Sequence, residues 1–367
     1  MFSAFRCWLV VGLLAYGSVA WGLADKVVKG EADRFLSDIH QLTLSGSRSG
    51  EGYFRLDGNY MVFQSEREKD NPFYQIYLMN LMTGETNRVS PGYGKTTCSW
   101  VHPLEEKVLY ASTHLDKESR AKQKDEFKQR AEATKRRYAW DYDENYDLFV
   151  SDFRGKRTKR LTKEKGYDAE ASYSHDGEWI VFASNRSGYA EKLSEQDAKI
   201  FKVDPSYEID LYLMRSNGED LKRLTTSKGY DGGPFFNADS TMITWRRFAP
   251  DARSAEVFVM NRDGSGEKQL TKFGAISWAP YFHPSGDYLI FSSNLGGGHN
   301  FELYLVRTDG QGQVVQVTNN EGFDSLPVFT PDGRQIAWTA TRAQEGKAQI
   351  FMAKWDDAGA RKALGLG

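Results

Sequence analysis

In residues 210–225 the chain reads DLYLMRSNGEDLKRLT, an apolar strand followed by a polar Asn-Gly turn and a Leu-Thr tail. Segments so rich in aromatic and β-branched residues, and so short, are typical of strands. Successive tails lie 47, 72, 63, 46 and 47 residues apart. A repeat of about 40–50 residues predicts the four-stranded blades of a β-propeller. The six tails are Leu42-Thr43, Val89-Ser90, Leu161-Thr162, Leu224-Thr225, Leu270-Thr271 and Val317-Thr318.

Each repeat also predicts where its inner strands lie. Turns such as Asp57-Gly58 and Pro331-Asp332-Gly333 precede the second strands, because Pro and Asp favour turns and Gly tolerates a positive φ. We expect second strands at 61–63, 108–110, 180–182, 243–245, 289–291 and 336–338. We expect third strands at 75–79, 146–150, 210–214, 256–260, 302–306 and 349–353.

The two ends of the chain predict how the ring closes. The first tail, within residues 39–43, has no strands before it, and the last repeat ends in a weak tail at residues 362–365. We therefore expect the N-terminal segment to pair as the outer strand of the last blade, which removes an open sheet edge. The predicted fold is an all-β, six-bladed propeller over residues 25–367.

Residues 1–24 are typical of a secretory signal peptide. Arg6 supplies the positive charge, residues 7–16 are apolar, and small residues follow. The apolar stretch is short for a membrane span, so we expect export to the periplasm and no stable membrane insertion once the signal is removed. Cys98 is then the only cysteine, and we interpret it as a small buried strand residue.

Two repeats are enlarged. Residues 114–146 contain a strongly charged segment of good helix formers, and residues 187–208 enlarge the next repeat. Because blade strands alternate in direction, both insertions should share one rim with the loops that join successive blades. Functional residues favour loops held by a rigid scaffold, so this rim is the candidate functional face.

The loops between blades carry related phrases. They include Gly166-Tyr167-Asp168-Ala169-Glu170, Gly229-Tyr230-Asp231-Gly232-Gly233-Pro234, Ser277-Trp278-Ala279-Pro280 and Gly322-Phe323-Asp324-Ser325-Leu326-Pro327. In these phrases the chain resembles the TolB-like propellers built from PD40 repeats. It is also similar to the propeller parts of some secreted zinc aminopeptidases. The resemblance covers nearly the whole chain after residue 24 and implies a periplasmic six-bladed propeller that works by binding.

The bulk chemistry argues against several function classes. Charge is balanced, with 48 basic and 50 acidic residues, which disfavours nucleic-acid binding. We find neither a G-x-S-x-G nor an H-E-x-x-H motif. His102, His175 and His283 occupy the same turn in different blades, so a turn role is favoured over metal ligation. We predict no cofactor, no metal site and no catalytic residues.

Four acidic residues recur where one blade joins the next. One interpretation is a ring of carboxylates at the channel mouth that gathers a cationic or hydroxylated ligand. The other is that each aspartate caps its loop by accepting backbone N–H groups. The aspartates recur at the same position of successive repeats, which favours the structural interpretation. Glu170 breaks this pattern and is therefore the stronger candidate for a functional residue. The residues are Asp168, Glu170, Asp231 and Asp324.

Arg246, Arg247 and Trp278 also break the repeat. The two arginines stand where other blades carry small residues. Because successive strand residues take opposite faces, one should point into the sheet or toward the channel. A structural ion pair and the binding of an anion or a peptide carboxylate both remain open. With the four acidic residues, these three complete the candidate binding site.

The sequence thus predicts an exported protein- or peptide-binding module without catalysis of its own. A first alternative is an accessory propeller for a separately encoded peptidase. A second is a propeller polysaccharide lyase, although such an enzyme would need a cluster of His, Arg or Lys with a metal site. The expected partner is a protein or peptide, such as an envelope protein or a peptidase.

Overall fold

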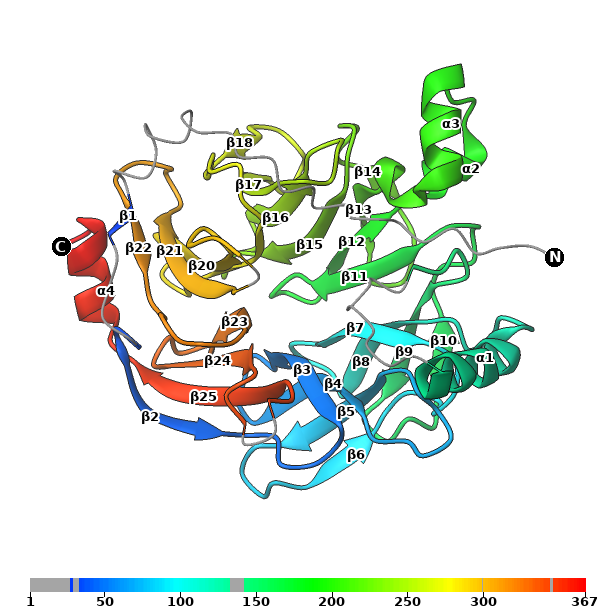
Figure 1. The fold of residues 1–367 in the computed structure, drawn as a ribbon, viewed down its shortest axis with the longest axis horizontal. Coiled ribbons are helices and arrows are strands. Elements are labelled where there is room, and N and C mark those ends of the chain that lie inside the picture. The colour runs from blue at the N-terminus through cyan, green and yellow to red at the C-terminus, as the bar shows by residue number, and fades with distance from the viewer. Residues whose placement is uncertain (1–26, 29–32, 133–141, 299, 344–345) are drawn as a thin grey trace.

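The computed structural model describes residues 27–28, 33–132, 142–298, 300–343 and 346–367. Over these residues the strands form six sheets around a common centre (Figure 1), which confirms the predicted six-bladed all-β propeller. The predicted signal peptide (residues 1–24) lies outside the described residues, as do residues 133–141 of the first insertion.

The first three blades follow one another along the chain, each with its strands in sequence order. The first consists of β3 (Arg48–Phe54), β4 (Tyr60–Glu66), β5 (Gln75–Asn80) and β6 (Thr86–Arg88). The second consists of β7 (Thr96–Val101), β8 (Lys107–Ser112), β9 (Asp147–Asp152) and β10 (Thr158–Arg160). The third consists of β11 (Asp168–Tyr173), β12 (Trp179–Ser184), β13 (Asp210–Arg215) and β14 (Lys222–Arg223).

The remaining three blades keep the same order, and the fifth and sixth each gain a strand from the N-terminal segment. The fourth consists of β15 (Asp231–Phe236), β16 (Met242–Phe248), β17 (Ala255–Asn261) and β18 (Lys268–Gln269). The fifth consists of β19 (Ser277–Phe282), β20 (Tyr288–Ser293), β21 (Glu302–Arg307), β22 (Val314–Gln316) and β1 (Val27–Val28). The sixth consists of β23 (Asp324–Phe329), β24 (Gln335–Ala340), β25 (Gln349–Trp355) and β2 (Leu36–Gln41).

The ring closes through β2. This strand pairs antiparallel with β25, placing Leu36 opposite Trp355 and His40 opposite Met352. The blue strand β2 and the red strand β25 therefore lie side by side in Figure 1. The prediction that the N-terminal segment completes the last blade is confirmed, and the pairing covers the edge of β25 that would otherwise be open.

The Leu-Thr tails have a shared structural task. In every blade the hydroxyl of the tail accepts a hydrogen bond of 2.9 Å from a backbone N–H of the third strand. A hydroxyl can satisfy a buried N–H just where the outer strand leaves the sheet, which explains why Ser or Thr recurs there. The six hydroxyls belong to Thr43, Ser90, Thr162, Thr225, Thr271 and Thr318.

The C-terminus differs from the expected weak strand. It forms α4 (Asp357–Leu364), which begins where the Asp356 carboxylate accepts the Gly359 N–H and ends at Gly365, with φ of 69°. Ala360 and Leu364 bury one face of this helix. Because β2 already occupies the edge of β25, the segment has no strand to join and packs as a helix instead. The second unexpected element is β1, which pairs parallel with β22.

Helices occupy both insertions, as predicted. The first holds α1 (Ser119–Glu132), and the second holds α2 (Arg186–Ala190), α3 (Glu195–Val203) and the 3₁₀ helix η3 (Pro205–Glu208). A hydrogen bond of 2.9 Å joins the hydroxyls of Tyr142 and Tyr189, so the two insertions lie on one face. We call this the insertion face. No helix of the described residues is long and apolar enough to cross a bilayer.

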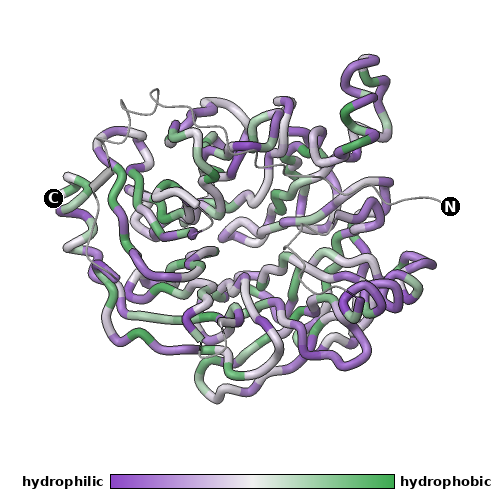
Figure 2. The backbone as a smooth tube through the Cα atoms, in the orientation of Figure 1, coloured by the Kyte–Doolittle hydropathy of each residue, from purple (hydrophilic) through white to green (hydrophobic). Residues whose placement is uncertain are grey.

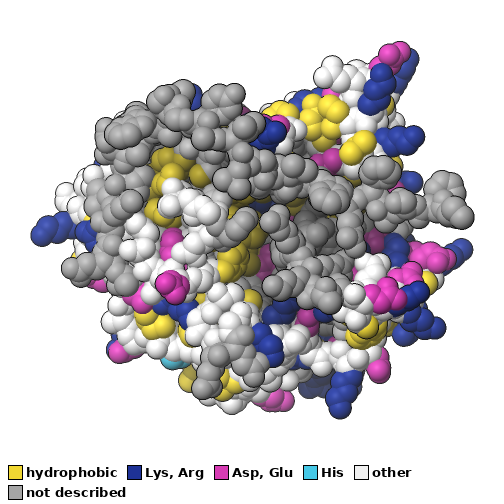
Figure 3. Space-filling model, viewed as in Figure 1, with side chains coloured by type: hydrophobic (Ala, Val, Ile, Leu, Met, Phe, Trp, Pro, Cys, Tyr) yellow, Lys and Arg dark blue, Asp and Glu magenta, His cyan; other side chains and the backbone are white. Residues whose placement is uncertain are grey.

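The core lies between neighbouring sheets, and α1 lies outside it. Trp245 and Trp338 are among the largest fully buried side chains, and apolar residues run along the strands in Figure 2, whereas α1 is hydrophilic. Acidic and basic side chains are interspersed around α1 and α3 in Figure 3. The side chain of Gln123 holds α1 in place: its amide donates to the Asp70 carbonyl at 2.9 Å, and its oxygen accepts the Gly94 N–H at 3.0 Å.

Candidate functional site

The innermost strand of every blade contains a β-bulge, where its register against the second strand shifts. One residue of each bulge has a left-handed backbone, with φ between 47° and 61°. Bulges of this kind re-aim side chains and are common beside functional sites. All six residues line one cavity, and we call them the bulge ring: Glu51, Cys98, Glu170, Gly233, Ala279 and Leu326.

The cavity has a volume of about 560 Å³ and lies at the end of the channel on the insertion face. Glu126 and Arg130 of α1 form part of its wall. Its bulge ring is chemically uneven, because Glu51, Cys98 and Glu170 come from three consecutive blades while the other three blades contribute glycine, alanine and leucine. The backbone of the bulge ring therefore repeats six times, but its titratable side chains are confined to three neighbouring blades.

Glu170 and Arg246 form a two-point ion pair across the boundary between the third and fourth blades. Arg246 Nη1 and Nη2 each donate to one Glu170 carboxylate oxygen at 3.0 Å. The Gly233 N–H and the Tyr230 hydroxyl donate to the same carboxylate. Burial opposes ionisation of Glu170, but the Arg246 guanidinium outweighs it and holds the pKa of the carboxyl below its usual value. Arg246 thus faces the channel and is engaged in an ion pair.

Gly233 makes room for this pair. A Cβ at this position would clash with Arg246 Nη1, and φ is 61°. Gly233→Ala should displace the guanidinium and lower the free energy of unfolding by about 1–3 kcal/mol, the usual cost of overpacking, measured by denaturant titration. Gly84→Ala is the matched control, because Gly84 has φ of 73° and no atom within 4 Å of the added Cβ. Equal losses in the two variants would show that the contact with Arg246 is unimportant.

The three recurring aspartates do not line the cavity, which corrects the predicted ring of carboxylates at the mouth. They are buried, with relative exposures of 0, 0 and 1%. They lie two positions before the bulge and bind arginine side chains rather than capping backbone N–H groups. The pairs are Asp168 with Arg186 at 2.6 Å, Asp231 with Arg247 at 2.6 Å and Asp324 with Arg342 at 3.0 Å.

The other blades show that this position has a structural task. There the residue is Ser49, Thr96 or Ser277, and its hydroxyl contacts a serine of the second strand at 2.9–3.1 Å. The aspartates likewise bind Ser184, Arg247 and Trp338 of their second strands, so the position ties the innermost strand to the second strand in all six blades. Arg247 belongs to this framework, because it also donates to Glu267 at 2.7 Å and does not line the cavity.

Trp278 does line the cavity, directly before the bulge residue Ala279. Its ring packs near Phe301 and Phe323, with centroids 5.7 and 6.4 Å away. The indole Nε1 is buried without a hydrogen-bond partner among the described residues. A buried N–H is normally satisfied, so this unpaired donor is an unusual feature of the cavity wall.

Glu51 is the site residue that sequence reasoning missed. Its carboxylate lies 3.4 Å from the Tyr53 hydroxyl, and its backbone N–H donates to Thr339 Oγ1 at 3.1 Å. Burial, with repulsion from Glu170, raises the pKa of Glu51 to about 7. The signal was present, because Glu51 follows Ser49 by the same two positions that separate Glu170 from Asp168.

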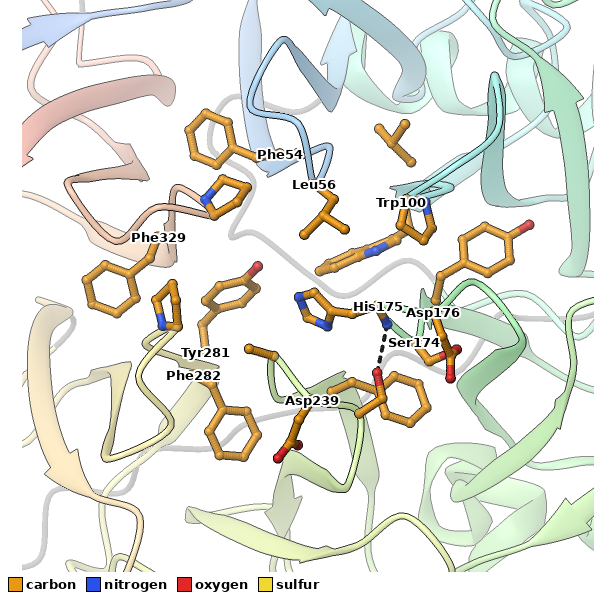
Figure 4. A pocket seen from close by; sticks show the side chains of 18 of the residues that line it. Phe54, Leu56, Trp100, Ser174, His175, Asp176, Asp239, Tyr281, Phe282 and Phe329 are labelled. Atoms are coloured by element: carbon orange, nitrogen blue, oxygen red, sulfur yellow. Dashed lines mark hydrogen bonds between the residues drawn. The ribbon is translucent and has the colours of Figure 1, made fainter.

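A second cavity, of about 400 Å³, lies at the opposite end of the channel and is lined by turns between first and second strands. In Figure 4 the His175 ring points into it between Trp100 and Tyr281. The backbone N–H of His175 donates to Ser240 Oγ at 2.9 Å. This end is lined largely by aromatic side chains and prolines that close the hairpin turns.

Two of the three turn histidines, His102 and His283, accept backbone N–H groups of their own turns, whereas the buried His175 Nδ1 has no hydrogen-bond partner among the described residues. His102 Nδ1 lies 3.0 Å from the Glu105 N–H, and His283 Nδ1 lies 3.2 Å from the Ser285 N–H. Within the described residues, no three His, Cys, Asp or Glu side chains lie close enough to hold a metal ion together.

Comparisons with known proteins agree with this architecture. The putative TolB from Agrobacterium tumefaciens superposes with a TM-score of 0.55 at 15% identity, covering 87% of this chain and 97% of that one. TolB from Acinetobacter baumannii gives 0.52 at 13%, covering 84% and 64%. Oligogalacturonate lyase from Vibrio parahaemolyticus gives 0.52 at 14%, covering 87% and 94%. At such identities the likeness shows the fold alone.

Part of the chain also matches a family model. Residues 234–365 match PD40, the TolB beta propeller domain. These residues span the fourth, fifth and sixth blades after the first strand residues of β15. The chain is therefore a six-bladed β-propeller whose fold is similar to that of TolB proteins and whose residues 234–365 match the TolB beta propeller domain PD40.

Proposed function

We propose that the protein is an exported, non-catalytic binding module that holds a protein or peptide partner in the cavity on the insertion face. The N-terminal sequence supports export to the periplasm. The observation that carries the proposal is a cavity of about 560 Å³ in which the titratable side chains of the bulge ring come from three neighbouring blades. Ligand-binding pockets in proteins have volumes of about 300–1,000 Å³. The cavity is therefore large enough to take side chains from an inserted segment of a partner.

The wall of the cavity is preorganised for binding. Glu66 accepts from Arg48 at 2.6 Å and from Arg130 of α1 at 3.2 Å, which fixes the helix against the first blade. Lys122 of the same helix lies 2.7 Å from Asp143. A rigid wall lowers the entropic cost of ordering the interface. The insertion also offers exposed apolar contacts beyond the cavity, at Leu115 and Phe127.

A capture experiment tests the proposal. The purified protein is crosslinked in envelope extract, and captured partners are identified by mass spectrometry. Trp278→Ala should reduce capture of a specific partner at least tenfold, the effect of losing an aromatic hot spot worth about 2 kcal/mol. Leu104→Ala is the control, because Leu104 is exposed and lies on the opposite face in the turn between β7 and β8.

Two results would count against the proposal. Capture that survives Trp278→Ala but is lost with Leu104→Ala would move the binding site to the opposite face. Unsaturated product formed from uronate oligomers, followed by ultraviolet absorbance, would contradict a non-catalytic role. If the captured partner is a peptidase, the module is an accessory of that enzyme, whereas an envelope protein would indicate a structural role.

A further inference from the structure

The charges that line the cavity are paired, with one exception. Arg246 faces Glu170 at 3.0 Å, and Lys95 faces Asp143 at 3.6 Å. A chain of ion pairs joins Arg48, Glu66, Arg130 and Glu126. Glu51 alone among these lining groups has no cationic partner among the described residues. Among the described residues, Glu51 is therefore the lining carboxylate that no lysine or arginine neutralises by direct contact.

The groups around Glu51 do not supply a cationic partner for its carboxylate. Tyr53 lies on its own strand, and the Cys98 thiol and the Glu170 carboxylate face it from the next two blades. Arg246 is within electrostatic range, but its guanidinium is held by both oxygens of Glu170 and stacks over Tyr230 at 4.7 Å.

Much of the remaining wall is aromatic, beside neutral polar residues such as Gln64 and Thr97. Faces of Tyr and Trp rings attract cations and also contact an alkyl stem. An anion would find each lining cation already facing a carboxylate, so the chemistry of the wall favours a positive ligand. The rings that line the cavity belong to Tyr53, Phe73, Tyr74, Tyr146, Tyr167, Phe235 and Trp278.

We propose that the cavity recognises a cationic side chain of the partner, an ammonium or guanidinium group on an apolar stem, with Glu51 as its counter-ion. This inference rests on the proposed binding function and names the chemistry of its ligand. The stem lies against the aromatic wall, and the charge reaches the bulge ring, where Glu51 gains the partner that the protein itself does not provide.

Calorimetric titration with three capped amino acids tests this inference: N-acetyl-lysine amide, N-acetyl-arginine amide and N-acetyl-norleucine amide. At about pH 8, at least one cationic probe should bind the full chain tenfold or more tightly than norleucine, a typical gain for a desolvated charge pair. Glu51→Gln should remove that preference. Glu85→Gln, the same change on an exposed residue of the same blade, should leave it intact. The two cationic probes show which head group is preferred.

The dependence on pH gives a second readout. Because the pKa of free Glu51 is about 7, binding of a cation should weaken roughly tenfold or more between about pH 8 and pH 5.5, and Glu51→Gln should abolish this dependence. Equal binding of lysine and norleucine probes, no binding of any probe, or a preference that survives Glu51→Gln would overturn the inference. The capture experiment with Trp278→Ala judges the proposed function separately.

Discussion

Replacement of Arg246 by leucine is expected to lower the free energy of unfolding by about 3–5 kcal/mol, because it leaves the Glu170 carboxylate buried without its counter-ion. The side chains of Arg246 and Glu170 are only 10% and 9% exposed. In that setting the desolvation cost of Glu170 is no longer offset, and its pKa should rise. Denaturant titration at neutral pH measures the loss.

Two further variants isolate the cause. The double variant Glu170→Gln with Arg246→Leu should recover a large part of the loss, since no charge then remains buried. Arg215→Leu removes an exposed partner of Glu178, a pair 40% and 63% exposed, and a contact with the Trp179 ring at 3.9 Å, and should cost about 1–2 kcal/mol. If Arg246→Leu and Arg215→Leu cost the same, the pair at the mouth does not stabilise the fold as described.

Glu51→Gln should have the opposite effect and stabilise the protein at alkaline pH. Because the pKa of Glu51 is raised from 4.5 to about 7 in the folded state, the unfolded chain releases this proton first as pH rises. The wild-type protein should therefore lose stability through the window from about pH 4.5 to pH 7, reaching a penalty of about 3 kcal/mol above it. Glutamine carries no charge and escapes this penalty.

Unfolding titrations across this pH range test whether Glu51→Gln raises or lowers the free energy of unfolding. The difference between Glu51→Gln and the wild type should be near zero at about pH 4 and largest at about pH 8. A variant that is less stable than the wild type at alkaline pH would show that Glu51 is satisfied within the protein. This prediction also separates binding from folding, because the variant expected to lose cation binding is expected to gain stability.

Much of the fold was predictable because the repeat encodes backbone requirements. The tail hydroxyls recur because each satisfies a third-strand N–H, and Gly58, with φ of 72°, serves the tight turn that its Asp-Gly sequence predicts. The closing role of β2 followed from a tail without strands before it. The helix α4 did not follow from the repeat, because its formation depends on β25 already being paired.

The candidate site was only partly predictable. Glu170, Arg246 and Trp278 broke the repeat and do line the cavity. Asp231 and Arg247 were misplaced at the mouth because their burial depends on cross-strand pairing, in which they stand opposite each other. The β-bulge decides which residue of each innermost strand points into the channel, and the strand pattern of the sequence does not locate that bulge.

Photocrosslinking from position 326 of the bulge ring tests the cavity on the insertion face most directly. Leu326 lines this cavity, and Leu56 lines the one at the opposite end. With p-benzoylphenylalanine placed at either position, we predict an adduct to the partner from position 326 and none from position 56. An adduct from position 56 alone would contradict binding at the insertion face.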